Sequence, residues 1–146
     1  MNKQEAFQQS ILNNNISEFE ILLNDDEVNP SFDNNWAIQN ASRNGFTAMV
    51  RLLLNDKRVD PSKNKNWSIL AASGNGHIEI VKLLLNDLRV DPSQNKSIYM
   101  ANMNEHVEIV NILIKDKRVI DVLKKENNFT SKYILTKHIQ EKLREF

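Results

Sequence analysis

The sequence predicts an all-α solenoid built from repeated helix–turn–helix units, and three observations support this prediction. Three consecutive segments of the 146-residue chain align with one another. Each segment carries apolar residues at spacings of three and four, which place them on one face of an α-helix. Each segment also begins with a proline-containing junction that bars a continuing helix. Because one such unit cannot bury its own apolar face, we expect the units to stack in a row.

The repeat is clearest between residues 28–58 and residues 59–89. These segments align without gaps when Val28 is placed opposite Val59, and 17 of the 31 positions are identical. Residues 90–118 match the second segment at 17 of 29 positions when a two-residue gap is placed opposite Asn66 and Trp67. Two agreements of this size predict three structural copies of one unit.

The flanking segments extend the same register. Phe19–Asp25 lies one repeat period before Val50–Asp56 and resembles it, so residues 1–27 are expected to form an N-terminal capping repeat. Residues 119–146 are expected to form a C-terminal cap with one amphipathic helix, and the whole chain a single domain. The apolar residues on one side of that helix are Tyr133, Ile134, Ile139 and Leu143.

Within each unit, we predict a short first helix, a tight turn and a second helix. In the second clear copy, the first helix should cover Trp67–Gly74, where small side chains permit close approach of a neighbour. Asn75 and Gly76 tolerate left-handed φ angles, which suits the turn. The second helix should run from near His77 to near Asn86. The expected core combines its apolar stripe with one isoleucine from each first helix: Ile80, Val81, Leu84 and Leu85, with Ile38, Ile69 and Ile98.

Composition excludes several classes of protein. Lys plus Arg and Asp plus Glu each number 19, and this zero net charge argues against a free-standing nucleic-acid binder. The absence of cysteine excludes disulfides and thiolate zinc sites, and three glycines cannot supply the standard phosphate-binding loops. No uninterrupted apolar run exceeds four residues, and the polar N-terminus does not resemble a secretory signal. We therefore expect an intracellular protein that neither crosses nor binds a membrane.

Charge is distributed unevenly along the chain. Residues 1–27 carry six acids and one base, a net charge of −5, and the remaining segments sum to +5. Such a dipole can steer a partner or favour head-to-tail contact between copies. Basic residues recur at the junctions, but Asp56, Asp87 and Asp116 interleave with them and offset their charge. We therefore expect no nucleic-acid partner.

One stretch resembles a known family motif. Asn75–Leu85 reads N-G-H-I-E-I-V-K-L-L-L, which is similar to the N-G-H-L-E-V-V-K-L-L-L core of the ankyrin repeat. The resemblance covers essentially the whole chain and implies an ankyrin-type α-α superhelix that binds proteins through its concave face. The V-D-P-S junctions look like those of the short ankyrin arrays of large DNA viruses of amoebae. The last repeat, residues 90–118, retains part of this motif: Asn104, His106, Val107, Glu108, Ile109 and Val110.

The sequence departs from the ankyrin pattern in two respects. The family's T-P-L-H opening is replaced by Trp67-Ser-Ile-Leu70, so the histidine hydrogen bonds of that position are not expected. The repeat period is also two residues shorter than is usual in the family, and the shortening falls in the hairpin loop. A protruding β-hairpin is therefore in doubt.

Neither catalytic nor metal-binding residues are expected. His77 and His106 occupy equivalent positions in adjacent units, about 8–10 Å apart, which is too far to share one zinc ion. We interpret each histidine as capping or packing at the turn before its second helix. Glu79 and Glu108 fall in the first turn of the second helix, where they oppose the positive end of the helix dipole. The sequence predicts no cofactor and no enzymatic activity.

The predicted function is protein binding through loop tips and the exposed side of the first helices. Trp36 and Trp67 recur one period apart and have two interpretations. They form a ladder of binding hot spots on the concave face, or each indole packs on its own loop as part of the core. The alternatives to a binding module are a self-assembling structural subunit and an adaptor that recruits targets to a larger complex. We expect a monomer, with weak self-association as the alternative, and an unidentified protein partner. The predicted partner-binding residues are Asp33, Asn35, Trp36, Arg43, Lys63, Lys65, Trp67, Asn95 and Tyr99.

Overall fold

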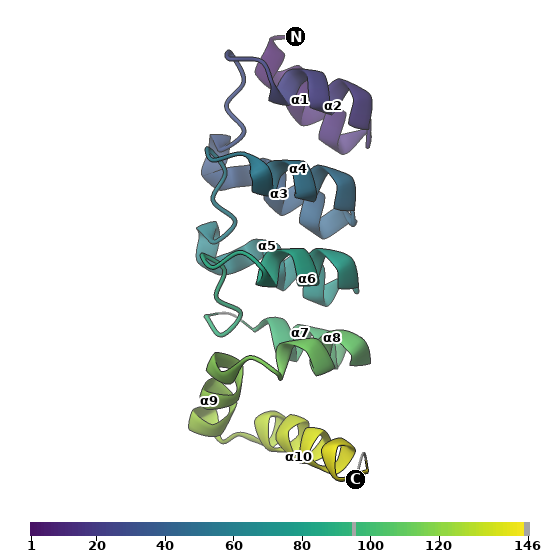
Figure 1. Ribbon diagram of the computed structural model, residues 1–146, viewed down its shortest axis with the longest axis vertical. Helices are drawn as coiled ribbons and strands as arrows, with labels where there is room; N and C mark the ends of the chain where they lie inside the picture. Colours follow the sequence, from purple (N-terminus) through teal and green to yellow (C-terminus); the bar gives the residue numbers. More distant parts are fainter. Residues whose placement is uncertain (95, 145–146) are drawn as a thin grey trace.

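The computed structural model describes residues 1–94 and 96–144, and these residues form a row of stacked helix pairs (Figure 1). The described residues contain helices and no β-strand, so the predicted all-α helix–turn–helix solenoid is confirmed. The first helices of the four units are α1 (Lys3–Leu12), α3 (Phe32–Asn44), α5 (Lys63–Gly74) and α7 (Ser97–Met103). The second helices are α2 (Ile16–Leu23), α4 (Thr47–Asn55), α6 (Ile78–Leu85) and α8 (Val107–Leu113), followed by α9 (Lys117–Glu126) and α10 (Phe129–Arg144).

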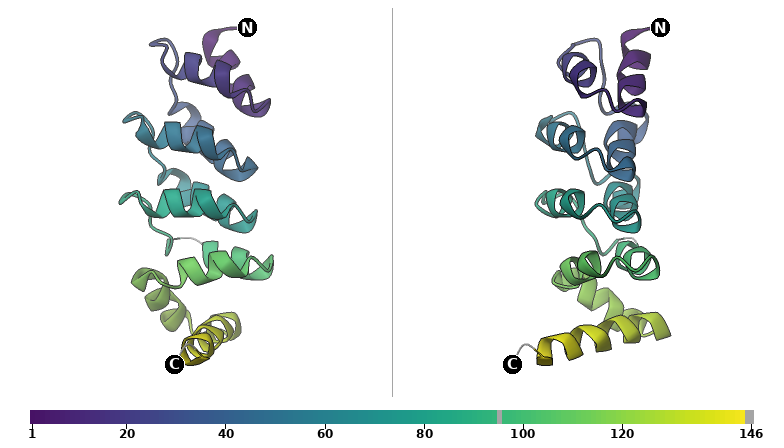
Figure 2. Two further views of the ribbon diagram at one scale, coloured as in Figure 1. Left: turned by 45° about the vertical axis from the view of Figure 1, so that its right-hand side comes forward. Right: turned by 90° about the vertical axis from the view of Figure 1, so that its right-hand side faces the viewer.

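The first helices stack in one column and the second helices in another. The right-hand view of Figure 2 shows the helices of both columns end-on. Neighbouring first helices pack against each other more extensively than neighbouring second helices do. Their small side chains allow this close approach, because Ala41, Ala72 and Ala101 are fully buried between them. The first helices therefore form the more tightly packed side of the stack.

The predicted core is confirmed except at Leu85, which is only partly buried against it. Ile38 and Ile69 are fully buried and Ile98 is 3% exposed, and each of them comes from a first helix. From the second helices, Val81 and Leu84 are fully buried. Buried apolar residues from every unit join in one continuous core along the row, as expected of units that bury their apolar faces only against each other.

The N-terminal unit combines a buried aromatic pair with polar replacements on its outer side. Phe7 and Phe19 stack with their ring centroids 5.2 Å apart. Glu5 and Glu18 lie one repeat period before Trp36 and the buried Met49, and both glutamates are exposed. This unit therefore carries acids where the next unit carries apolar residues.

The C-terminal region differs from the prediction in three ways. It contains two helices rather than one, and α9 begins at Lys117, so the predicted boundary at residue 119 falls inside a helix. The sequence signal for α9 was the Asp116 side chain, which accepts a hydrogen bond from the Arg118 amide at the helix start. The predicted apolar side of α10 is also wrong. Of its four residues only Ile134 is buried, and exposed fractions are 50% for Tyr133, 57% for Ile139 and 69% for Leu143.

None of the helices in residues 1–94 and 96–144 is both long and apolar enough to span a bilayer.

Candidate partner-binding face

Two left-handed turns precede the straight parts of α3 and α5. Asp33–Asn35 and Asn64–Asn66 each contain three consecutive residues with φ between 49° and 66°. Asparagine and aspartate tolerate this conformation better than other non-glycine residues, because their short side chains bond locally. The D-N-N and N-K-N sequences therefore form compact turns, and the described residues contain no β-hairpin at these places.

The last residue of each left-handed turn connects two units. The Asp60 backbone amide donates to Asn35 Oδ1 at 2.7 Å, and the Asp91 amide donates to Asn66 Oδ1 at 2.8 Å. In the N-terminal unit Gln4, the counterpart of Asn35 one period earlier, does the same by accepting from the Asn29 amide at 2.8 Å. These three amide side chains satisfy the backbone of each following junction.

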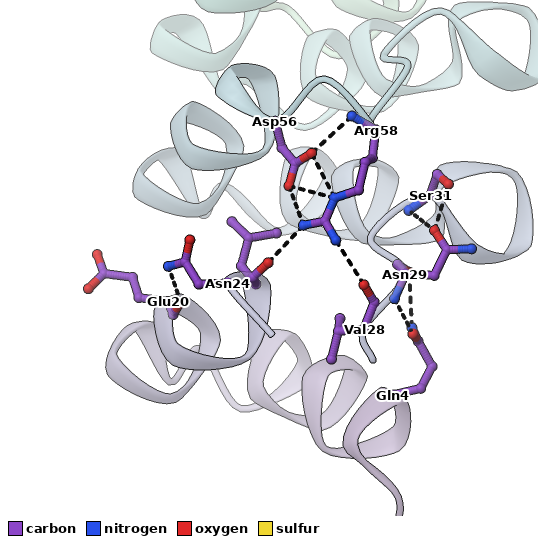
Figure 3. A network of polar contacts seen from close by, with 9 residues as sticks. Gln4, Glu20, Asn24, Val28, Asn29, Ser31, Asp56 and Arg58 are labelled. Atoms are coloured by element: carbon purple, nitrogen blue, oxygen red, sulfur yellow. Dashed lines mark hydrogen bonds and ion pairs between the residues drawn. The ribbon is translucent and has the colours of Figure 1, made fainter. Parts of the chain in front are cut away.

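Arginine side chains connect the same junctions from the other side. Arg58 forms a bidentate pair with Asp56 and donates to the carbonyls of Leu23 and Val28 at 2.8 and 3.0 Å (Figure 3). Arg89 repeats the arrangement by donating to the Val59 carbonyl at 2.8 Å. Arg58 therefore reaches back to the preceding unit, Arg89 bonds the first residue of its own segment, and neither side chain belongs to a free basic ridge. The third pair consists of Asp116 and Arg118, whose guanidinium donates to the Val90 carbonyl at 3.4 Å.

The arginines also control the ionisation of their partners. Hydrogen bonds from the arginine hold the pKa of Asp56, Asp87 and Asp116 below the ordinary value, although partial burial opposes this. The three carboxylates are therefore charged in the folded protein under all but strongly acidic conditions.

The two histidines make inter-unit contacts that the sequence analysis did not identify. His77 Nε2–H donates to the Arg43 carbonyl at 2.9 Å, and His106 Nε2–H donates to the Gly74 carbonyl at 3.1 Å. Each imidazole lies over a glycine of the preceding unit: a Cβ added to Gly45 or Gly76 would lie 2.7 Å from the ring. Both histidines therefore pack at the turn as predicted, but neither side chain makes a capping hydrogen bond.

Most of the predicted partner-binding residues lie at the surface. Asp33 and Lys65 are exposed in the two left-handed turns, Arg43 is exposed near the end of α3, and Lys63 is exposed at the start of α5. The Lys63 ammonium lies 3.6 Å from the Asp60 carboxylate. We refer to the side of the stack formed by α3, α5 and their left-handed turns as the first-helix face.

Trp36 and Trp67 are both half-buried, so each indole contributes to packing and to the surface. Trp36 lines a narrow crevice with Gln4 and Phe7 of α1, which places it against the preceding unit rather than on its own loop alone. Phe32 lines the same crevice and is 49% exposed. Phe32 was not predicted, because the equivalent positions in later units are Lys63 and a glutamine.

Two predicted partner-binding residues, Asn35 and Tyr99, contact other parts of the chain, and a third lies outside the described residues. The prediction of an exposed Asn35 is wrong, because its side chain is 3% exposed and bonds the next unit. Tyr99 is half-buried, and its hydroxyl contacts Ser131 at 2.7 Å and the Glu126 carboxylate. Burial and Glu126 raise the pKa of this phenol. Tyr99 therefore joins α7 to the C-terminal helices, and Asn95 lies outside the described residues.

Three larger hollows lie away from the first-helix face. One of about 540 Å³ lies between α2 and α4, and two of about 350 Å³ lie between α4 and α6 and between α8 and α10. None of the predicted partner-binding residues lines these hollows. Small-molecule sites are concave, so the first-helix face is better suited to another macromolecular surface.

Within residues 1–94 and 96–144, no cluster of three or more His, Asp or Glu side chains could hold a metal ion.

The paired helices, tight turns and unit-to-unit bonding define a helical-repeat solenoid. A family model described as "Ankyrin repeats (3 copies)" matches residues 38–126, and the chain belongs to this ankyrin-repeat family. Comparisons with curated proteins and with solved structures gave no match. Ankyrin repeats generally mediate protein–protein interactions, and the family is typically non-catalytic.

Proposed function

We propose that the chain is a non-catalytic module that binds a partner protein through the first-helix face. One observation carries this proposal: large aromatic side chains recur at the surface of adjacent units at the start of α3 and α5. Phe32, Trp36 and Trp67 are all partly exposed there. Aromatic side chains that are pre-positioned and become fully covered dominate the binding energy of protein interfaces.

The bonds between units hold this face in one conformation before a partner binds. Asn35 and Asn66 fix the turns that carry the aromatic residues, and His77 fixes the end of α3 against the next unit. A surface that is ordered before binding loses little conformational entropy when the partner arrives. Lys63 and Lys65 precede Trp67 in the same turn, which favours a partner that presents carboxylates beside apolar side chains.

The proposal extends to the source of the protein, because the V-D-P-S junctions support an ankyrin protein of a large DNA virus, acting in the cytoplasm of its host. As an adaptor, the chain would deliver the bound protein to a larger complex, which it would contact through a second surface.

The test compares proteins captured from a cell extract by the wild-type chain, by Trp67→Ala and by Leu88→Ala. Leu88 is 98% exposed in the loop after α6, so its substitution removes exposed apolar surface away from the first-helix face. We expect Trp67→Ala to lose at least one captured protein by about tenfold, and Leu88→Ala to retain it.

Thermal unfolding of both variants separates binding from stability. If Trp67→Ala unfolds far below the wild type, the indole belongs to the core, and the charge reversals Arg43→Glu and Lys63→Glu then test the face. Capture that is equal for the wild type and for all three variants of the first-helix face contradicts the proposal.

A further inference from the structure

The outer side of α10 carries large apolar residues that the chain leaves uncovered. Its inner side packs through Ser131 and Ile134, which are 0% and 2% exposed. Phe129, Ile139 and Leu143 are 86%, 57% and 69% exposed. Together with Lys132 and Thr136 they follow each other at spacings of three and four, so they form one stripe along the helix. We call the five residues the outer stripe.

An outer stripe of this kind is unusual at the end of a stack. Helical-repeat proteins present polar outer faces on their terminal elements, because solubility requires it. Exposed apolar side chains that recur along one stripe of a terminal element therefore indicate a binding surface. Figure 1 shows α10 across the end of the row, with only α9 and the fourth unit beside it.

The opposite end of the row has a matching apolar position. Ile21 is 73% exposed, although its equivalents Leu52 and Leu83 are half-buried against the core. Leu52 lines a hollow together with Glu20 and Leu23 of α2, so this position faces the preceding unit. In the N-terminal unit the same position faces outward.

The two ends also carry opposite charge. Residues 1–27 have a net charge of −5, and the exposed Glu18 lies near Ile21 in α2. Helix α10 has four bases and one acid within residues 129–144, a net charge of +3. Opposite charges on two surfaces steer their encounter and suppress contact between like ends.

We infer that the outer stripe of α10 docks on the N-terminal unit of a second copy of this chain. The helix would occupy the place where a preceding unit contacts Leu52 or Leu83 in later units. The contact joins two different surfaces, so each copy retains one free end and the assembly grows head to tail. This inference does not depend on the proposed first-helix face.

The test uses two variants that each disable one end. Ile21→Lys places a base on the acceptor surface, and Leu143→Glu places an acid in the outer stripe. Both residues are exposed, so neither change should disturb the fold. Sedimentation velocity over a range of concentrations should show concentration-dependent oligomers for the wild type. Each variant alone should weaken association at least about tenfold.

The mixture of the two variants is the decisive sample. The normal contact joins the N-terminal unit of Leu143→Glu to the outer stripe of Ile21→Lys. The second contact would bury an introduced base against an introduced acid in place of two apolar side chains, and the desolvation cost disfavours it. An equimolar mixture should therefore form mainly one-to-one dimers. Oligomers of the wild type should dissociate in about 1 M salt, where the Debye length is about 3 Å. The control Leu88→Glu should associate as the wild type does.

Three results would overturn the inference. The first is a wild-type chain that stays monomeric at concentrations up to about 1 mM. The second is a mixture of the two variants that forms no dimer. The third is a monomer that binds phosphatidylserine vesicles and loses this binding in Leu143→Glu, which would assign the outer stripe to a membrane surface instead.

Discussion

The three junctions between units and the junction to the C-terminal helices are held by different contacts. Each of the three carries an amide side chain from one unit and an arginine from the next, beginning with Gln4 and Arg58. The last junction carries Tyr99, whose hydroxyl contacts Ser131 and Glu126. The change coincides with the two-residue deletion in the fourth unit, which removes the counterparts of Asn66 and Trp67.

The difference shows what the left-handed turn contributes. Where the turn is present, its buried asparagine bonds the following junction, and the next unit repeats the geometry. In the fourth unit, which carries the deletion, α7 is only seven residues long, and α10 does not lie parallel to the helices of the units (Figure 2). An amide side chain therefore accompanies every junction at which the helix pairs stay parallel: Gln4 in the first unit and the asparagine of the left-handed turn in the next two.

The largest effect should come from the interior of the row. Leu84→Ala should lower the free energy of unfolding by about 2–5 kcal/mol, because it leaves a cavity at a fully buried position. Leu143→Ala makes the same substitution at an exposed position near the end of α10, and it should change the free energy of unfolding by less than about 0.5 kcal/mol. Urea denaturation of both variants measures the contrast, and equal midpoints would contradict the burial of Leu84.

The next effect should come from the glycine under a histidine ring. Gly76→Ala should cost about 2 kcal/mol, because Gly76 has φ of +79° and its new Cβ would displace His106. Gly74→Ala is the matched control: its φ is not left-handed and its added Cβ would meet Met100 at 3.6 Å, an ordinary contact. We expect the control to be neutral or slightly stabilising, as measured by thermal unfolding. If the two substitutions cost the same, the ring does not constrain the turn.

A smaller effect should separate two asparagines of one left-handed turn. Asn66→Ala should cost about 1–3 kcal/mol, because it removes the acceptor for the Asp91 amide at a buried site. Asn64→Ala changes an exposed residue with the same backbone conformation, so it reports the conformational cost alone. Chemical denaturation should place Asn64→Ala between Asn66→Ala and the wild type. Equal costs would mean that the side-chain bond adds nothing.

The smallest effect concerns the stability of the fold at acidic pH. Arg89 lowers the pKa of Asp87 in the folded protein, so this carboxylate stabilises the fold above its unfolded pKa of about 3.9. The stabilisation is lost as the pH falls through the lower, folded pKa. Asp87→Asn should therefore reduce the loss of stability between neutral and acidic pH, measured by denaturation at several pH values. An unchanged pH profile would show that the pair contributes nothing to stability.

Sequence periodicity was sufficient for the fold and most of the core. The repeat period placed the first and second helices of each unit, and it located Ile38, Ile69 and Ile98 correctly because apolar spacing directly reports which face is buried. The helix α9 was missed because it does not repeat an earlier segment. The stripe of α10 was assigned to the wrong side because its spacing fits two faces, and only packing against the fourth unit decides between them.

The candidate site was less predictable, for a physical reason. Asn35 and Asn66 are polar residues in short turns, and their burial depends on a backbone amide in the next unit. Tyr99 has a partner 32 residues away in a helix that does not belong to the repeat. Contacts of this kind depend on tertiary structure, and local patterns do not reveal them. The recurrence of Asp and Arg two residues apart was visible, but it indicated only an offset of charge.

The bonds that arginine and histidine side chains make to the preceding unit have a direction. Arg58, His77 and His106 all donate from a later unit to main-chain carbonyls of an earlier one. During synthesis the acceptors are therefore complete before the donors emerge from the ribosome, so each finished unit can template the next. Truncation therefore removes different partners at the two ends: removing units from the C-terminus leaves carbonyls without their donors, whereas removing them from the N-terminus leaves a guanidinium or an imidazole without its carbonyl acceptor.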